Sequence, residues 1–91
     1  MIAIQVSLYP LEQEDINRVL EIFWGYLRKN DIDHRITPLS TLVWGEDEDH
    51  LFKIIFRAYK EARRQGPAVM VTTVTTADKA RISELLGYLK I

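Results

Sequence analysis

The first nine residues alternate between large apolar side chains and smaller or polar ones, which is the period of a strand with one buried face. The apolar positions are Ile2, Ile4, Val6 and Leu8. Pro10 ends this strand, because proline has no amide hydrogen to give to a neighbouring strand. Over residues 12–29 the spacing changes, and apolar side chains recur every three or four positions. This spacing predicts a helix that packs one side on a core.

Five further elements are predicted after this helix. They are an edge strand over residues 32–36, a strand over residues 39–46, a helix over residues 47–65, a strand over residues 69–76 and a helix over residues 77–89. The longer helix begins at a cap supplied by Asp47 or the residue beside it. It ends at Gly66-Pro67, since glycine favours a helix end and proline cannot continue the helix. The last helix carries its apolar side chains on one side, at Ile82, Leu85, Leu86 and Leu89.

The order of these elements is β-α-β-β-α-β with an added carboxy-terminal helix. This order belongs to the α+β class and predicts a ferredoxin-like split βαβ fold in a single domain over residues 1–91. Right-handed crossovers give an antiparallel sheet of order 4-1-3-2. The end of the first strand, at Ser7 and Tyr9, then lies beside the start of the third strand, at Ser40 and Thr41. The start of the fourth strand arrives at the same end, on the other side of the first strand.

One face of the predicted sheet is left open, because both crossover helices lie on the other face. The first strand turns Gln5, Ser7 and Tyr9 to this open face. The third strand has two possible orientations, in which either Ser40, Leu42 and Trp44 or Leu39, Thr41 and Val43 face the helices. An open sheet face is commonly covered by a partner or used for a ligand. We therefore expect at least a dimer.

The composition narrows the possible functions. The 91 residues include 12 basic and 13 acidic side chains, a formal net charge of −1, so no excess of positive charge favours nucleic-acid binding. Because the chain has no cysteine, it has neither a disulfide framework nor a thiolate site. No signal peptide and no apolar run of membrane-spanning length are found. We expect a cytoplasmic protein without a nucleic-acid or membrane partner.

Several short motifs occur in a fixed order along the predicted fold. They are Val6-Ser7-Leu8-Tyr9-Pro10-Leu11, Leu39-Ser40-Thr41-Leu42-Val43-Trp44-Gly45, Phe52 with Ile55-Phe56-Arg57-Ala58, and Val71-Thr72-Thr73. Their order and spacing over residues 2–76 resemble the YkoF-type family of thiamine-binding and hydroxymethylpyrimidine-binding proteins. The resemblance implies a ferredoxin-like unit that works in pairs, either as tandem repeats or as a homodimer or a homotetramer, and the single copy in this chain implies one of the two homo-oligomers. It also implies binding of the aminopyrimidine of thiamine, or of its precursor, without any conversion of that ligand.

The chemistry of the implied ligand can be compared with the residues themselves. An aminopyrimidine has a flat face and an edge that both donates and accepts hydrogen bonds, so its site needs neutral polar groups beside an apolar wall. The candidate hydrogen-bonding residues are Gln5, Ser7, Ser40, Thr41, Thr72 and Thr73. Tyr9 and Trp44 are candidate walls. We expect no catalytic residue, no metal site and no cofactor besides the ligand.

Alternative interpretations of these residues stay open. Serine and threonine in strands are more often spacers than ligand contacts, and a tryptophan such as Trp44 more often belongs to a core or a subunit interface than to a ligand wall. The acidic run at residues 46–49 matches a helix start, where negative charge is favourable, as well as a metal cluster. The alternative function is a regulatory or structural ferredoxin-like oligomer that binds an amino acid, another small metabolite or no ligand. An RNA-recognition domain would need aromatic side chains within a basic strand motif. An acylphosphatase-like enzyme would need a phosphate-binding loop with arginine, and neither feature is found.

Overall fold

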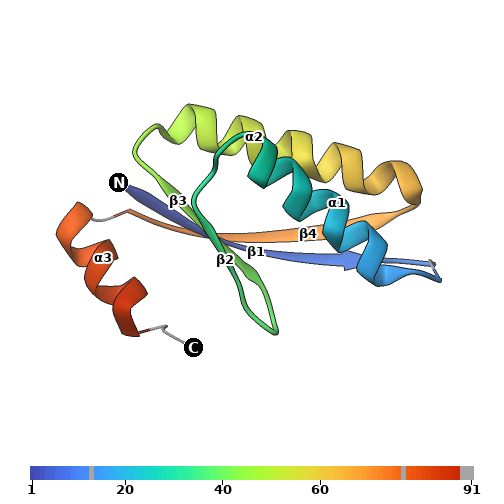
Figure 1. Cartoon of the computed structure of the whole chain (residues 1–91), viewed down its shortest axis with the longest axis horizontal. Coiled ribbons are helices and arrows are strands. Elements are labelled where there is room, and N and C mark those ends of the chain that lie inside the picture. Colours follow the sequence, from blue (N-terminus) through green and yellow to red (C-terminus); the bar gives the residue numbers. More distant parts are fainter. Residues whose placement is uncertain (13, 77, 89–91) are drawn as a thin grey trace.

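The strands and helices follow the predicted order (Figure 1) in a computed structural model that describes residues 1–12, 14–76 and 78–88. The strands are β1 (Ile2–Pro10), β2 (His34–Ile36), β3 (Thr41–Gly45) and β4 (Ala68–Thr76). The helices are α1 (Ile16–Lys29), α2 (Glu48–Ala62), the short 3-10 helix η1 (Arg63–Gln65) and α3 (Lys79–Tyr88). Within the described ranges, no helix is long and apolar enough to cross a membrane.

The four strands form one antiparallel sheet in the order β2-β3-β1-β4, so the predicted α+β ferredoxin-like arrangement is confirmed. The central strand β1 pairs with β3 from Ile2, opposite Gly45, to Val6, opposite Thr41. The same strand pairs with β4 along its whole length, ending with Pro10 opposite Ala68. β1 therefore continues past the end of its ladder with β3, and β4 is its strand neighbour there.

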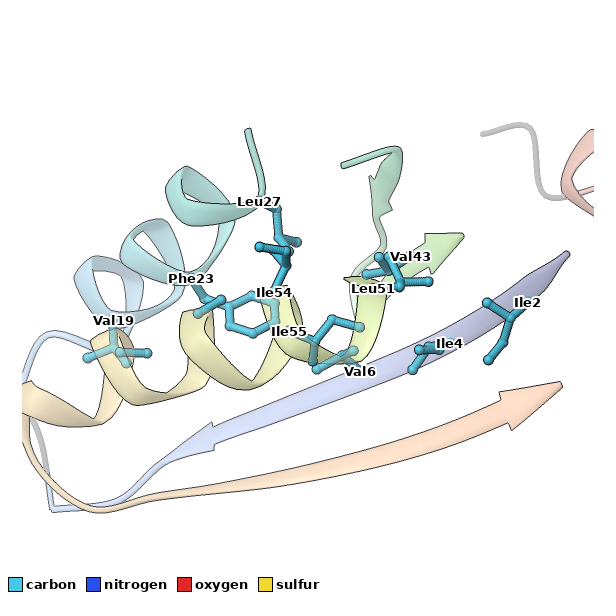
Figure 2. Close-up of a cluster of buried hydrophobic side chains, with 12 residues drawn as sticks. Ile2, Ile4, Val6, Val19, Phe23, Leu27, Val43, Leu51, Ile54 and Ile55 are labelled. Carbon is cyan, nitrogen blue, oxygen red and sulfur yellow. The ribbon is translucent and has the colours of Figure 1, made fainter. Parts of the chain in front are cut away.

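The hydrophobic core lies between one face of the sheet and the pair of helices α1 and α2 (Figure 1). Its buried side chains are Ile2, Ile4 and Val6 of β1, Val43 of β3, Val19, Phe23 and Leu27 of α1, and Leu51, Ile54, Ile55, Ala58 and Ala62 of α2. Figure 2 shows the labelled side chains of the helices pointing toward those of the two central strands. Most of the apolar positions that predicted β1 and both helices thus form the core, whereas Ile16 at the start of α1 is exposed.

The strand register determines which way β3 faces. Thr41 lies opposite Val6, and residues paired across antiparallel strands point their side chains to the same face. Because Val6 belongs to the core, Thr41 also points toward the helices, as does Val43 two residues later. Leu42 and Trp44 point to the opposite face. Of the two orientations left open by the sequence, the structure therefore has the one that buries Thr41.

The start of α1 differs from its prediction. The helix begins at Ile16 and not at residue 12, because the carboxylate of Asp15 accepts a hydrogen bond from the backbone N–H of Arg18 at 3.0 Å and caps the helix. Glu12 has a φ of 54°, which is incompatible with a right-handed helix. The acidic residues before Ile16 therefore precede the helix and do not form its first turn.

The predicted ends of α2 are confirmed with one difference. Asp47 caps the start, since its carboxylate accepts from the backbone N–H of His50 at 3.1 Å. The helix ends at Ala62, and the tighter η1 turn continues the coil to Gln65. Gly66 follows with a φ of 151° and a ψ of −179°, a conformation that favours glycine.

α3 lies over part of the sheet face that is opposite α1 and α2, so the face that was expected to be open is partly covered. Arg35 lies opposite Leu42 on this face, and its guanidinium donates a hydrogen bond to the Leu86 carbonyl at 3.2 Å. Ile82 of α3 is only 2% exposed although it is separate from the main core. Of the predicted apolar side of this helix, Leu89 and the side chain of Leu85 lie outside the described residues.

The remainder of the second face carries exposed apolar side chains. Tyr9 lies opposite Val69, and Val71 lies opposite Ser7. The side chains of Tyr9, Val69 and Val71 are exposed. In the described sheet, the outer edge of β4 has no strand neighbour. An unpaired edge next to exposed apolar side chains favours pairing with another chain.

The expected homodimer or homotetramer stays a prediction. Light scattering at micromolar concentration should give at least the mass of a dimer, because pairing would cover the exposed edge and the apolar side chains beside it. Val71→Lys should lower that mass, since a charged side chain would have to be buried in the contact. A monomer mass for the unmodified chain would contradict the prediction.

Candidate ligand-binding site

A cavity of about 480 Å³ lies where β1 extends past β3, and we call it the β1–β3 cavity. It is lined by residues 5–9 of β1, by Leu20, Phe23 and Trp24 of α1, and by residues 37–41. Pockets that bind small molecules commonly have volumes of roughly 300–1,000 Å³, so this one suits a small ligand. Leu39, which is 87% exposed, lies at the solvent side of the cavity.

One wall of the cavity is a turn at residues 37–40. The Thr37 N–H donates to the Ser40 carbonyl at 2.8 Å, and the Thr37 hydroxyl donates to the same carbonyl at 3.0 Å. The Thr37 hydroxyl oxygen also accepts from the Ser40 backbone N–H at 3.0 Å. These bonds close the turn between β2 and β3, and β3 begins at Thr41 and not at residue 39 as predicted.

Past the start of β3, the main chain of β1 has no strand neighbour on the cavity side in the described part of the sheet. Neighbouring residues of a strand point their N–H and C=O groups to opposite sides. The N–H of Leu11 donates to the Pro67 carbonyl on the β4 side, so the even-numbered residues of β1 point theirs to the β3 side. Val6 lies in the ladder opposite Thr41, whereas Leu8 lies past its end. The N–H and C=O of Leu8 therefore point to the cavity side of β1, where no strand of the described sheet pairs with them.

Thr41 connects the sheet to α1 at the cavity. Its side chain is buried, and its hydroxyl oxygen accepts a hydrogen bond from the indole Nε1–H of Trp24 at 2.9 Å. The bond gives the partly buried indole N–H an acceptor. Leaving this N–H without an acceptor would lower the stability of the folded protein. Trp24 and Thr41 both line the cavity, so this contact is part of its wall.

Ser7 reaches the cavity from the other face of the sheet. It lies opposite Val71 and shares the face of Gln5 and Tyr9, whereas Thr41 points toward the helices. Both residues line the cavity because it follows the free edge of β1, where side chains of both faces are accessible. The two hydroxyl-bearing segments thus meet at this end of the sheet, as expected from the topology, but from opposite faces.

The cavity brings together five of the predicted ligand contacts, namely Gln5, Ser7, Tyr9, Ser40 and Thr41. The other three, Trp44, Thr72 and Thr73, do not line this cavity. Trp44 lies opposite Ala3, toward the far end of the β1–β3 ladder. Thr72 and Thr73 lie on β4, and the order β2-β3-β1-β4 puts β1 between them and the cavity.

The wall supplied by α1 was not predicted from the sequence. Leu20 and Phe23 belong to the apolar stripe of α1, so their spacing does not separate a cavity wall from an ordinary core position. Trp24 falls partly off that stripe, and this is the one available signal. An indole at the margin of a buried side needs an acceptor for its N–H, and here the acceptor is Thr41.

The lining of the cavity is neutral. None of the described residues that line it carries a formal charge. Its polar groups are hydroxyls, one carboxamide and the main chain of β1, and its apolar surface includes the aromatic rings of Phe23 and Trp24. Such a lining suits a flat uncharged ligand with a hydrogen-bonding edge. Among the residues that the structure describes, no group of three or more His, Asp and Glu side chains could hold a metal ion.

Comparison with known proteins identifies shared architecture. No family model and no curated protein sequence matches this chain. Among solved structures, SP2199 from Streptococcus pneumoniae has a TM-score of 0.81 and 24% identity, over 94% of this chain and 97% of that one. A domain of unknown function, DUF77, from Bacillus cereus has a TM-score of 0.73 and 15% identity, over 86% of this chain and 77% of that one.

A third similar structure is TM0486 from Thermotoga maritima, a protein proposed to act in thiamine biosynthesis or salvage. It has a TM-score of 0.79 and 14% identity, over 98% of both chains. At these identities the comparisons establish a common fold. The chain has the ferredoxin-like fold of these proteins over nearly its full length.

Proposed function

We propose that this chain binds thiamine or its hydroxymethylpyrimidine moiety in the β1–β3 cavity and does not convert it. The observation that carries the proposal is the cavity itself, in which hydroxyl groups of two distant segments and the free main chain of β1 meet beside aromatic rings. Every lining group is neutral, and none forms a nucleophile–base pair. These features are those of a binding site for an uncharged heterocycle.

The free main-chain groups of Leu8 complement an aminopyrimidine. The exocyclic amine donates a hydrogen bond and the adjacent ring nitrogen accepts one. A backbone C=O and N–H that point the same way offer the matching acceptor and donor, as in a strand ladder. The half-buried Trp24 offers aromatic surface beside the ring.

The open side of the cavity suits the rest of the thiamine molecule. The thiazolium ring of thiamine is cationic, and burying it without a partner would be costly. Tyr9 and Leu39 are both exposed at the cavity. The pyrimidine can therefore enter while the thiazolium stays in contact with water.

Two further observations support a thiamine-related ligand. The motifs around Ser7 and Thr41 resemble those of the YkoF-type family, and both motifs contribute to the cavity. TM0486, whose proposed role concerns thiamine biosynthesis or salvage, shares the fold. We propose that the working form is a cytoplasmic homodimer or homotetramer.

The alternative of an amino-acid ligand is less well supported by this site. A free amino acid carries an ammonium and a carboxylate, and each needs an opposite charge or several hydrogen bonds when it is buried. The described lining offers no charged side chain to either group. A neutral pyrimidine requires no such partner.

Isothermal titration calorimetry with hydroxymethylpyrimidine, thiamine and a panel of amino acids tests the proposal. We expect saturable binding of both pyrimidines and no binding of the amino acids. Ser7→Ala should weaken pyrimidine binding roughly two- to tenfold, the usual effect of losing one neutral hydrogen bond. Thr73→Ala is the matched control, because Thr73 is exposed on β4 outside the cavity. Absence of binding for both pyrimidines would overturn the proposal.

A further inference from the structure

The hydrogen bond between Trp24 and Thr41 restricts what the Thr41 hydroxyl can offer to a ligand. An indole N–H can only donate, so at 2.9 Å Trp24 Nε1 occupies a lone pair of the Thr41 oxygen. A threonine hydroxyl has two lone pairs and one proton. Within the described residues, Trp24 is the hydrogen-bond partner that the structure gives to this hydroxyl, and the proton has no acceptor there.

The environment of Thr41 makes that proton available to the cavity. The residue is 5% exposed and lines the cavity, so little bulk water competes for its hydroxyl. A hydroxyl that accepts one hydrogen bond becomes a stronger donor through mutual polarisation. A buried hydroxyl proton that finds no acceptor is unfavourable. A ligand in the cavity therefore gains most by presenting an acceptor to Thr41.

We infer that Trp24 is a positioning residue that holds Thr41 as a hydrogen-bond donor, so that the cavity selects heterocycles with an unprotonated ring nitrogen at this point. The inference rests on the proposed function, since it specifies the ligand of the same cavity. A ring that presents N–H at this position could use only the second lone pair of the Thr41 oxygen, and the hydroxyl proton would then have no acceptor on the ligand. A buried hydroxyl proton without an acceptor makes that arrangement the less favourable one.

A double-mutant cycle measured with hydroxymethylpyrimidine tests the inference. Thr41→Val should weaken binding roughly two- to tenfold, and Trp24→Phe should weaken it by a similar or smaller factor. The double variant should bind no more weakly than Thr41→Val alone, because Trp24 acts through the hydroxyl. Thr41→Ser, which keeps the hydroxyl, should retain binding. Trp44→Phe is the control, since Trp44 lies outside the cavity.

A measurement without ligand keeps the test independent of affinity. In two-dimensional NMR, the indole N–H signal of Trp24 should move in Thr41→Val and stay in place in Ser7→Ala. An unmoved signal in Thr41→Val would overturn the inference. The inference would also be overturned if Trp24→Phe weakened binding by the same factor in the unmodified chain and in Thr41→Val. Such additivity is what a general packing role of Trp24 predicts.

The two proposals fail differently. If the unmodified chain binds neither thiamine nor hydroxymethylpyrimidine, the proposed function is wrong and the inference about its ligand is wrong with it. If the unmodified chain binds hydroxymethylpyrimidine but the losses from Trp24 and Thr41 add independently, only the inference is overturned. Coupled losses together with retained binding in Thr41→Ser support both.

Discussion

Phe23→Ala should lower the free energy of unfolding by about 3–5 kcal/mol, the usual cost of removing a buried aromatic ring. Phe23 is 1% exposed and belongs to the core between α1, α2 and the central strands (Figure 2). Small domains have a total stability of about 5–15 kcal/mol, so this loss is a large part of it. Urea denaturation followed by circular dichroism should show a much lower midpoint.

Phe56→Ala is the matched control for that measurement. It removes the same atoms from α2, but Phe56 is 48% exposed and its ring contacts the Lys60 ammonium at 4.7 Å on the surface. We expect a loss of less than about 1 kcal/mol, since little burial and one exposed cation–π contact are removed. Similar losses for the two variants would contradict the assigned core.

Leu20→Trp should weaken pyrimidine binding at least about tenfold, equivalent to 1.4 kcal/mol or more. Leu20 lies on α1 and lines the β1–β3 cavity, and its side chain is half-buried. The larger indole would occupy volume that the ligand needs, because the packed residues around the cavity cannot move far enough to make room for both. Calorimetric titration with hydroxymethylpyrimidine measures the effect.

Ile16→Trp separates occlusion of the cavity from a general effect of a large side chain on α1. Ile16 lies one turn earlier on the same helix, is exposed and does not line the cavity. Its replacement should leave the affinity unchanged. Unaltered affinity in Leu20→Trp, measured on a folded variant, would mean that the ligand binds elsewhere.

The fold was predictable because its main determinants are local. The alternation around Ile4 and the three-to-four spacing in α1 and α2 follow directly from the periods of strands and helices, and the element order then limits the topology. The wrong boundaries arise where side chains compete for backbone groups. The carboxylate of Asp15 caps α1 at a later residue than predicted, and the hydroxyl of Thr37 accepts from the Ser40 N–H in the turn before β3. Hydrophobic spacing implies neither of these hydrogen bonds.

The site was predictable only in outline. The antiparallel arrangement brings Ser7 and Thr41 to one end of the sheet, and the sequence alone supports that step. The face of Thr41 could not be predicted, because both sets of alternating residues in β3 mix polar and apolar side chains. The role of Trp24 depends on a contact between residues 17 positions apart in different layers, which only the packed structure reveals. The cover supplied by α3 depends on tertiary contacts in the same way.

The extension of β1 beyond β3 has an evolutionary consequence. The recognition that we propose for the amide and carbonyl of Leu8 uses atoms that every residue except proline possesses in full. Substitutions at this position can alter the size or hydrophobicity of the side chain while the recognition groups persist. Ligand selectivity at such a strand can therefore outlast extensive sequence divergence, provided that the neighbouring strand continues to stop short.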